Sequence, residues 1–328
     1  MPSSYLYLGE IIAIVTTISW SIGIFPFTEA ARRLGPDSVN HFRLVLAVML
    51  LTIISLLFLP VSLTGLFTEP LAEHWLWFGL SGVIGLALGD HFAFTSFAIL
   101  GARVSSVFTT LSPAAALFTG YFVIGERINA AGTIGILVTI AGVIWLTLSK
   151  KAKSEMRDHE QGSKEKGIFY GMLSAVCQGV GIVLANKGFT YPLDGTALPF
   201  FQATWLRMIS ATVVIFTVTA FRGKIKEYIS PVLVNRNKGV PYTIAGTIFG
   251  PVIGVSLSML AVSLLHNKPS VAQTIFSLVP IFALPLAFFF YNEKITYKSL
   301  LGALIAITGV IILIWREELS TAITNLLF

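Results

Sequence analysis

The sequence predicts an all-α integral membrane protein, with ten transmembrane helices arranged as two inverted five-helix repeats. The first observation is composition, since 55% of the 328 residues are hydrophobic and only 12% are charged. A soluble domain carries about 25% charged residues, so this chain has too little polar surface to stay in water. The second observation is a series of apolar runs, each near the roughly 20 residues that a spanning helix needs. The third is a similarity between the two halves of the chain.

Ten apolar runs follow one another, mostly with short connections. The longest polar break is KKAKSEMRDHEQGSKEKG, from Lys150 to Gly167, and its mixed charges predict a solvated linker. We therefore expect a first repeat over residues 1–149, a linker over 150–166 and a second repeat over 167–328. The expected spans are approximately 8–30, 39–59, 75–99, 103–123, 130–148, 167–189, 200–221, 240–264, 270–290 and 297–315.

The two halves are similar in their distinctive residues and not only in their apolar ones. Residues 111–146 and 278–313 align without a gap at a constant offset of 167. An odd number of spans per repeat makes the second copy enter the membrane from the opposite side, which is the inverted-repeat design of secondary transporters. The matched pairs are Pro113 with Pro280, Glu126 with Glu293, Gly135 with Gly302, Gly142 with Gly309 and, earlier in each half, Arg43 with Arg207.

Each repeat ends in an acidic turn followed by an apolar helix that closes on Gly-Val, and this pattern resembles the EamA domain of the drug/metabolite transporter superfamily. The resemblance covers nearly the whole chain as two tandem copies, and it is strongest over 101–148 and 268–315. It implies ten helices, a central substrate cavity and movement of small organic metabolites or amino acids, often in exchange with protons. The second copy departs from the pattern at Asn292, where the first has Gly125, but Glu293 is kept.

Two ionisable residues, Asp90 and His91, lie deep within the third span, in GLALGDHFAF. A charge at mid-membrane costs on the order of 2.5–3.5 kcal/mol, so such a residue should face a cavity or a partner. Neighbours on a helix point about 100° apart, so we expect one side chain to line the cavity and the other to bond within the helix packing. Either is a candidate substrate or proton site, and the alternative for each is a buried polar contact that fixes helix packing.

Four further residues inside spans are candidates for binding substrate. Arg43 and Arg207 stand early in the second and seventh spans, where they can bind an anionic substrate, pair with Asp90 or extend to lipid headgroups. Trp20 and Gln178 occupy corresponding places in the first span of each half. A tryptophan at mid-span is a plausible cavity wall, although ordinary helix packing explains it equally well.

The matched glutamates Glu126 and Glu293 are expected to be structural. Each falls in a turn just ahead of a helix start, where a carboxylate meets exposed N–H groups and the positive end of the helix dipole. The prolines Pro113, Pro280 and Pro285 fall in the fourth and ninth spans, where they are expected to bend the helix.

The favoured function is secondary active transport, by alternating access, of a small organic metabolite or amino acid, with export in exchange for protons across a plasma or inner membrane. The alternative is an exchanger of anionic solutes such as sugar phosphates or nucleotide sugars, with Arg43 and Arg207 as the clamp. A channel or receptor is a third class, although the sequence has no filter motif and no appended soluble domain.

Other partners and activities are not expected. The chain has no GK[ST] phosphate loop, no HExxH, no GxSxG and a single cysteine, so we predict neither an enzyme nor a bound cofactor or metal. Its net charge of +6 comes from basic residues in short loops, which favours membrane lipid over nucleic acid. The protein is expected to be a monomer or a homodimer. Loop charge favours both termini outside, whereas the resemblance favours both inside.

Overall fold

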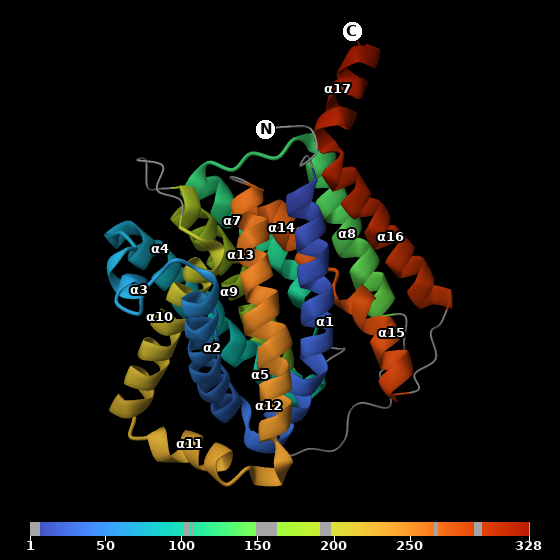
Figure 1. Ribbon diagram of the computed structural model, residues 1–328. Coiled ribbons are helices and arrows are strands. Elements are labelled where there is room, and N and C mark those ends of the chain that lie inside the picture. The colour runs from blue at the N-terminus through green and yellow to red at the C-terminus, as the bar shows by residue number, and fades with distance from the viewer. Residues whose placement is uncertain are drawn as a thin grey trace.

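The computed structural model describes residues 7–101, 105–106, 108–148, 163–190, 198–265, 268–291 and 297–327. Within these ranges the chain forms a bundle of helices without a strand (Figure 1), which confirms the predicted all-α membrane fold. Glu293 and residues 150–162 of the expected linker lie outside the described residues.

The first half contains α1 (Leu8–Leu34), α2 (Pro36–Phe58), α3 (Gly65–Thr68), α4 (Ala72–Gly82), η2 (Val83–Gly89), α5 (Asp90–Leu100), η3 (Phe108–Leu111), α7 (Ser112–Ile124) and α8 (Ala130–Leu148). The second half contains α9 (Lys164–Thr190), α10 (Phe200–Phe221), α11 (Ile225–Leu233), η4 (Arg236–Lys238), α12 (Val240–Thr247), η5 (Ile248–Val255), α13 (Ser256–Leu264), α14 (Pro269–Phe276), α15 (Val279–Tyr291), α16 (Tyr297–Ile314) and α17 (Arg316–Leu327).

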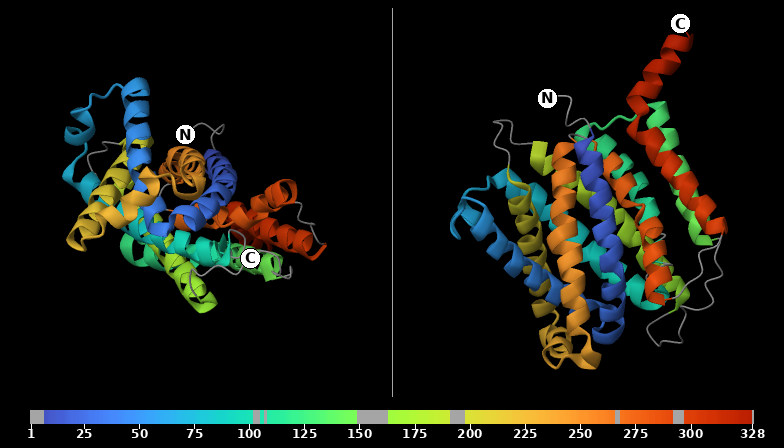
Figure 2. Two further views of the ribbon diagram at one scale, coloured as in Figure 1. Left: turned by 90° about the horizontal axis from the view of Figure 1, so that it is seen from below. Right: turned by 45° about the vertical axis from the view of Figure 1, so that its right-hand side comes forward.

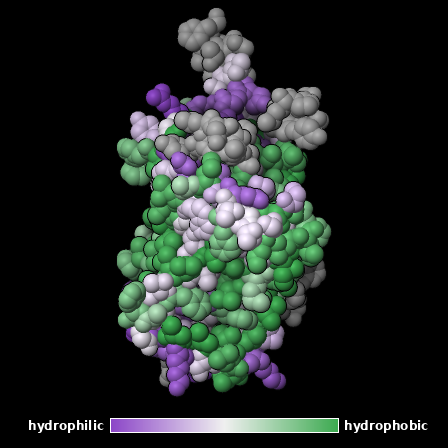
Figure 3. Space-filling model, turned by 60° about the vertical axis from the view of Figure 1, so that its left-hand side comes forward, coloured by the Kyte–Doolittle hydropathy of each residue, from purple (hydrophilic) through white to green (hydrophobic). Residues whose placement is uncertain are grey.

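Ten apolar helical segments occupy the expected positions. Among the described residues, seven are long and apolar enough to cross a membrane, and three shorter apolar helices cover Phe108–Ile124, Ala130–Trp145 and Leu300–Ile314. The surface agrees with this assignment, because Figure 3 shows a broad hydrophobic band on one face with hydrophilic residues gathered towards the two ends. The helices α8 and α16 pack along each other at one edge of the bundle (Figures 1 and 2).

Two spans change winding in their middle, which the sequence analysis did not predict. The third span runs α4, η2, α5 and the eighth runs α12, η5, α13, and both η2 and η5 are π-helical. A π turn shifts the hydrogen-bond ladder, and such turns are frequent at functional sites. The two π segments end immediately before Asp90 in the first half and before Ser256 in the second half.

The fourth and ninth spans are broken rather than bent at their first prolines. Pro113 lies in the first turn of α7, directly after η3, and Pro280 is the second residue of α15, after the turn that ends α14. A proline in a first turn costs little because its missing N–H would have no partner there. Pro285, by contrast, lies in the interior of α15, beyond its first turn, as expected.

Glu126 joins the two halves. It was expected to cap the helix that follows it, but its Oε1 accepts hydrogen bonds from the backbone N–H of Ser270 at 3.3 Å and from the Ser270 hydroxyl at 2.5 Å. Ser270 lies in the first turn of α14, in the other half of the chain. The carboxylate therefore caps a helix, as predicted, but the helix belongs to the second repeat.

Burial raises the pKa of Glu126 to about 7, although the hydrogen bonds from Ser270 oppose the shift. The side chain is 3% exposed, and its Oε2 has no hydrogen-bond partner among the described residues. A carboxyl group with a raised native pKa binds more protons in the folded than in the unfolded state, so its contribution to stability is lost as the pH rises towards 7.

We predict that the melting temperature of the detergent-purified protein falls by a few degrees more in the wild type than in Glu126→Gln when the pH is raised from about 5 to about 8. Glutamine keeps the acceptor for Ser270 but does not titrate. Equal slopes for the two proteins, measured by intrinsic fluorescence, would contradict the assignment.

Candidate functional site

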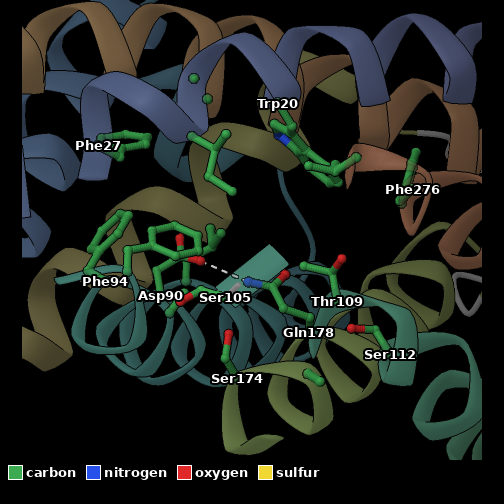
Figure 4. A pocket seen from close by; sticks show the side chains of 18 of the residues that line it. Trp20, Phe27, Asp90, Phe94, Ser105, Thr109, Ser112, Ser174, Gln178 and Phe276 are labelled. Atoms are coloured by element: carbon green, nitrogen blue, oxygen red, sulfur yellow. Dashed lines mark hydrogen bonds between the residues drawn. The ribbon is translucent and has the colours of Figure 1, made fainter. Parts of the chain in front are cut away.

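A cavity of about 160 Å³ lies among helices of both halves and contains most of the residues that the sequence singled out (Figure 4). Its walls are mostly apolar, with several aromatic rings, several small hydroxyl side chains and three charged side chains. The aromatic residues are Trp20, Phe27, Phe94, Phe97, Phe108 and Phe276, the hydroxyl residues include Ser105, Thr109, Ser112, Ser174 and Ser258, and the charged residues are Arg43, Asp90 and Arg207.

Asp90 is the polar centre of the cavity. Its Oδ2 lies 2.6 Å from Nη2 of Arg43, and its Oδ1 accepts a hydrogen bond of 2.8 Å from Nε2 of Gln178 (Figure 4). The three side chains come from α5, α2 and α9, so this cluster connects the first repeat to the second. Charge-assisted hydrogen bonds of this length are among the strong ones in proteins.

The π segment η2 explains why polar side chains gather here. Widened winding leaves backbone carbonyls without their usual α-helical partners, and the carbonyls of three successive residues, Gly85, Leu86 and Ala87, accept bonds from other helices. Arg43 Nη2 donates to Leu86 at 2.7 Å and Asn40 Nδ2 to Ala87 at 2.9 Å, and Gln178 Nε2 lies 3.5 Å from the Gly85 carbonyl; all three acceptors are in the same π turn.

Arg43 does not extend to the lipid headgroups, which was one of the alternatives for it. Its side chain is 1% exposed, and Nε and Nη2 both donate to Oδ1 of Asn40, at 3.1 and 2.9 Å. The reason is local, because Asn40 lies one helical turn before Arg43 on α2 and holds the guanidinium beside Asp90. Asn40 was not among the residues that the sequence singled out. The available signal was its position three residues before Arg43 within an apolar helix.

Arg207 is also buried, with 4% exposure, but it is held differently. Its Nη1 lies 3.2 Å from the thioether sulfur of Met259, and its Nε has no hydrogen-bond partner among the described residues. Gly82 of α4 lies directly on the backbone of Arg207, and any side chain there would overlap the Arg207 carbonyl. The absence of a side chain at Gly82 therefore lets α10 approach η2 and brings the guanidinium to the cavity.

Asp90 and His91 diverge, as neighbours on a helix should. His91 is not among the cavity-lining residues; its Nδ1 lies 3.0 Å from Oδ1 of Asp37, and both side chains are about one third exposed. This second pair connects α5 to the first turn of α2. The structure thus places Asp90 in the cavity and His91 in a helix–helix contact.

Trp20 and Gln178 both reach the cavity, from opposite halves (Figure 4). The indole of Trp20 packs edge-on against Phe276 of α14, with ring centroids 4.9 Å apart. Gly254 of η5 makes room for it, since a side chain at Gly254 would overlap the indole ring. Of the six candidates, five therefore line one cavity and His91 does not.

The comparisons with known proteins agree with this arrangement. A family model described as the EamA-like transporter family matches residues 7–148 and 165–315. The chain belongs to this family. The two matched segments confirm the resemblance found in the sequence, and because members of the family are transporters, the chain is a multi-pass membrane transporter of the drug/metabolite type.

One solved crystal structure shares the fold of this EamA-like protein. It is 14% identical in sequence, with a TM-score of 0.62, and the match covers 93% of this chain and 96% of the other. At that identity the likeness concerns the fold alone. No curated protein sequence matches the chain.

We predict that removing either member of the buried Asp90–Arg43 pair lowers the free energy of unfolding, because each single change leaves a buried charge without its partner. Arg43→Met and Asp90→Leu should each destabilise the protein by about 3–5 kcal/mol, whereas the double variant should lose clearly less than the sum. Thermal unfolding in detergent measures this.

Lys224→Met is the matched control, because the Lys224–Glu227 pair is exposed and 3.5 Å long, and an exposed pair contributes little. If the stability losses of Arg43→Met and Asp90→Leu simply add in the double variant, the two side chains do not stabilise each other and the prediction is wrong.

Proposed function

We propose that this EamA-like protein is a secondary active transporter that moves a small organic solute, a metabolite or an amino acid, by alternating access. The observation that carries the proposal is the cavity that residues of both repeats line, with buried charges from both halves in an otherwise apolar bundle. Transporters with inverted repeats place their substrate site at the interface of the repeats, near the middle of the membrane.

The broken helices support a moving structure. The fourth and ninth spans, η3–α7 and α14–α15, are interrupted beside the cavity, where Phe108, Phe276 and Val279 contribute to its lining. Discontinuous helices of this kind form the gates and sites of transporters with inverted repeats. We propose that residues 1–149 and 167–328 rock against each other around the cavity, with 150–166 as the linker.

Export across the plasma or inner membrane, driven by protons, is part of the same proposal. Asp90 is the candidate proton carrier, because a proton on its carboxyl group would remove the charge that holds Arg43 and weaken the contact with Gln178 of the other half. Protonation would in this way be connected to the contact between the repeats. The alternative, exchange of anionic solutes, draws support from the two buried arginines.

A bulky residue in the cavity should abolish transport without disturbing the fold. Ser174 of α9 lines the cavity, whereas Val176, two residues on, is 51% exposed on the outer face of the same helix. In proteoliposomes loaded with a broad panel of labelled metabolites, we expect Ser174→Phe to lose nearly all flux and Val176→Phe to retain it. Full flux through Ser174→Phe would remove the cavity from the pathway, and a wild type that moves no solute under any gradient would refute transport.

Proton coupling has its own test in the same vesicles. With a pH-sensitive dye inside, wild-type flux should be accompanied by proton movement, and Asp90→Asn should uncouple it while the variant still inserts and binds solute. If Asp90→Asn transports protons with solute as the wild type does, Asp90 is not the coupling site.

A further inference from the structure

The charges in the cavity do not balance, and this imbalance points to a class of solute. Among the lining residues that the structure describes, the charged ones are the guanidiniums of Arg43 and Arg207 and the carboxylate of Asp90. Arginine keeps its proton under all ordinary conditions, so with Asp90 ionised the described lining carries one surplus positive charge.

The imbalance has its origin in the repeat. Arg43 and Arg207 are matched positions, but the described lining residues include a carboxylate, Asp90, from the first half and none from the second. Arg43 therefore has a carboxylate at 2.6 Å, whereas Arg207 has a thioether at 3.2 Å and no ion pair among the described residues.

Asp90 lies close enough to attract Arg207 as well, but it makes no ion pair with it. One of its oxygens is held by Arg43 and the other by Gln178. An unpaired buried charge is unfavourable, and a ligand that supplies the missing negative charge relieves it on binding. Arg207 lines the cavity, so its guanidinium is the group that such a ligand would meet.

On the basis of the proposed transport function, we propose that the solute is an organic monocarboxylate with an apolar body and no ammonium group, whose carboxylate binds Arg207. A single carboxylate matches the single surplus charge. An amino acid fits less well, because its ammonium group would meet two guanidiniums and an aspartate whose oxygens are both engaged. A phosphate ester carries about −1.5 to −2 charge at neutral pH, which exceeds the surplus and repels Asp90.

The aromatic part of the cavity lining limits the size and shape of the apolar part of the solute. Trp20, Phe27 and Phe276 lie across the cavity from Asp90 (Figure 4). Phe97 lines the cavity as well, and these rings suit an aromatic ring or a compact aliphatic chain. A cavity of about 160 Å³ suits a small molecule rather than a nucleotide sugar.

The test is a set of five probes that share a phenyl ring and differ in their polar group. They are 3-phenylpropionate, its amide, phenylalanine, 2-phenylethylamine and phenyl phosphate. We expect 3-phenylpropionate to bind the detergent-purified protein and raise its melting temperature, and the amide and amine to give no shift. Stronger binding of phenylalanine or phenyl phosphate than of 3-phenylpropionate would overturn the proposal.

The variant Arg207→Met distinguishes a binding role of Arg207 from a structural one. A structural role predicts a lower melting temperature of the free protein, whereas a binding role predicts weaker binding of 3-phenylpropionate. Replacing an unpaired buried charge by an apolar side chain of similar length should leave the melting temperature of the free protein unchanged or higher. The same change should weaken 3-phenylpropionate binding about tenfold or more, since a charge-assisted contact is lost. Arg222→Met is the control, because Arg222 is an exposed residue at the C-terminal end of the same helix.

Three results would contradict the monocarboxylate proposal. A lower melting temperature in free Arg207→Met would show that Arg207 stabilises the protein through a partner of its own, which overturns the surplus charge. Unchanged affinity would remove Arg207 from the site. If no probe binds the wild type while the vesicle panel still shows flux that Ser174→Phe abolishes, the monocarboxylate proposal fails and the transport proposal stands.

Discussion

The ion pair between Asp90 and Arg43 is the constraint on which the rest of the site depends. Inside an apolar bundle each of these charges is more stable with its partner than without it, which favours keeping the helices that carry them together while both are charged. Three helices and the π segment meet at this pair, through Asn40, Gln178 and the carbonyl of Leu86. The π turn is the structural means, because its altered winding frees carbonyls in the middle of a span to accept bonds from other helices.

The two repeats share a backbone plan but not a charge pattern. Both third-position spans wind through a π segment and both fourth-position spans are broken, yet a carboxylate follows the π segment only in the first half. In the proposed transport cycle, the related backbones of the two repeats would provide the two conformations, and the asymmetric charges would select the solute.

A second contact between the halves lies away from the cavity. Glu126 in the loop after α7 caps α14, and α14 also provides Phe276 to the cavity wall. The same short helix thus connects a group with a pKa near 7 to the ring that packs on Trp20. Because α14 ends in a turn before α15, it is a short helix between the Glu126 cap and the cavity.

The sequence by itself determined the membrane location, the helical class, the two similar halves and five of the residues that line the cavity. These follow from composition, run length and the cost of placing charges in lipid, all of which are local properties of the chain. It also indicated that Asp90 and His91 point in different directions, because helical geometry alone requires this.

Only the tertiary structure decided which partners those residues have. That Arg43 is paired and Arg207 is not, that Glu126 caps a helix of the other repeat, and that π turns precede Asp90 and Ser256 all depend on contacts between segments far apart in the chain. Sequence spacing fixes the face of a helix that a side chain occupies, but the neighbour it meets depends on how close two backbones come. Here that distance is set by positions such as Gly82, where the missing side chain brings α10 and its arginine to the cavity.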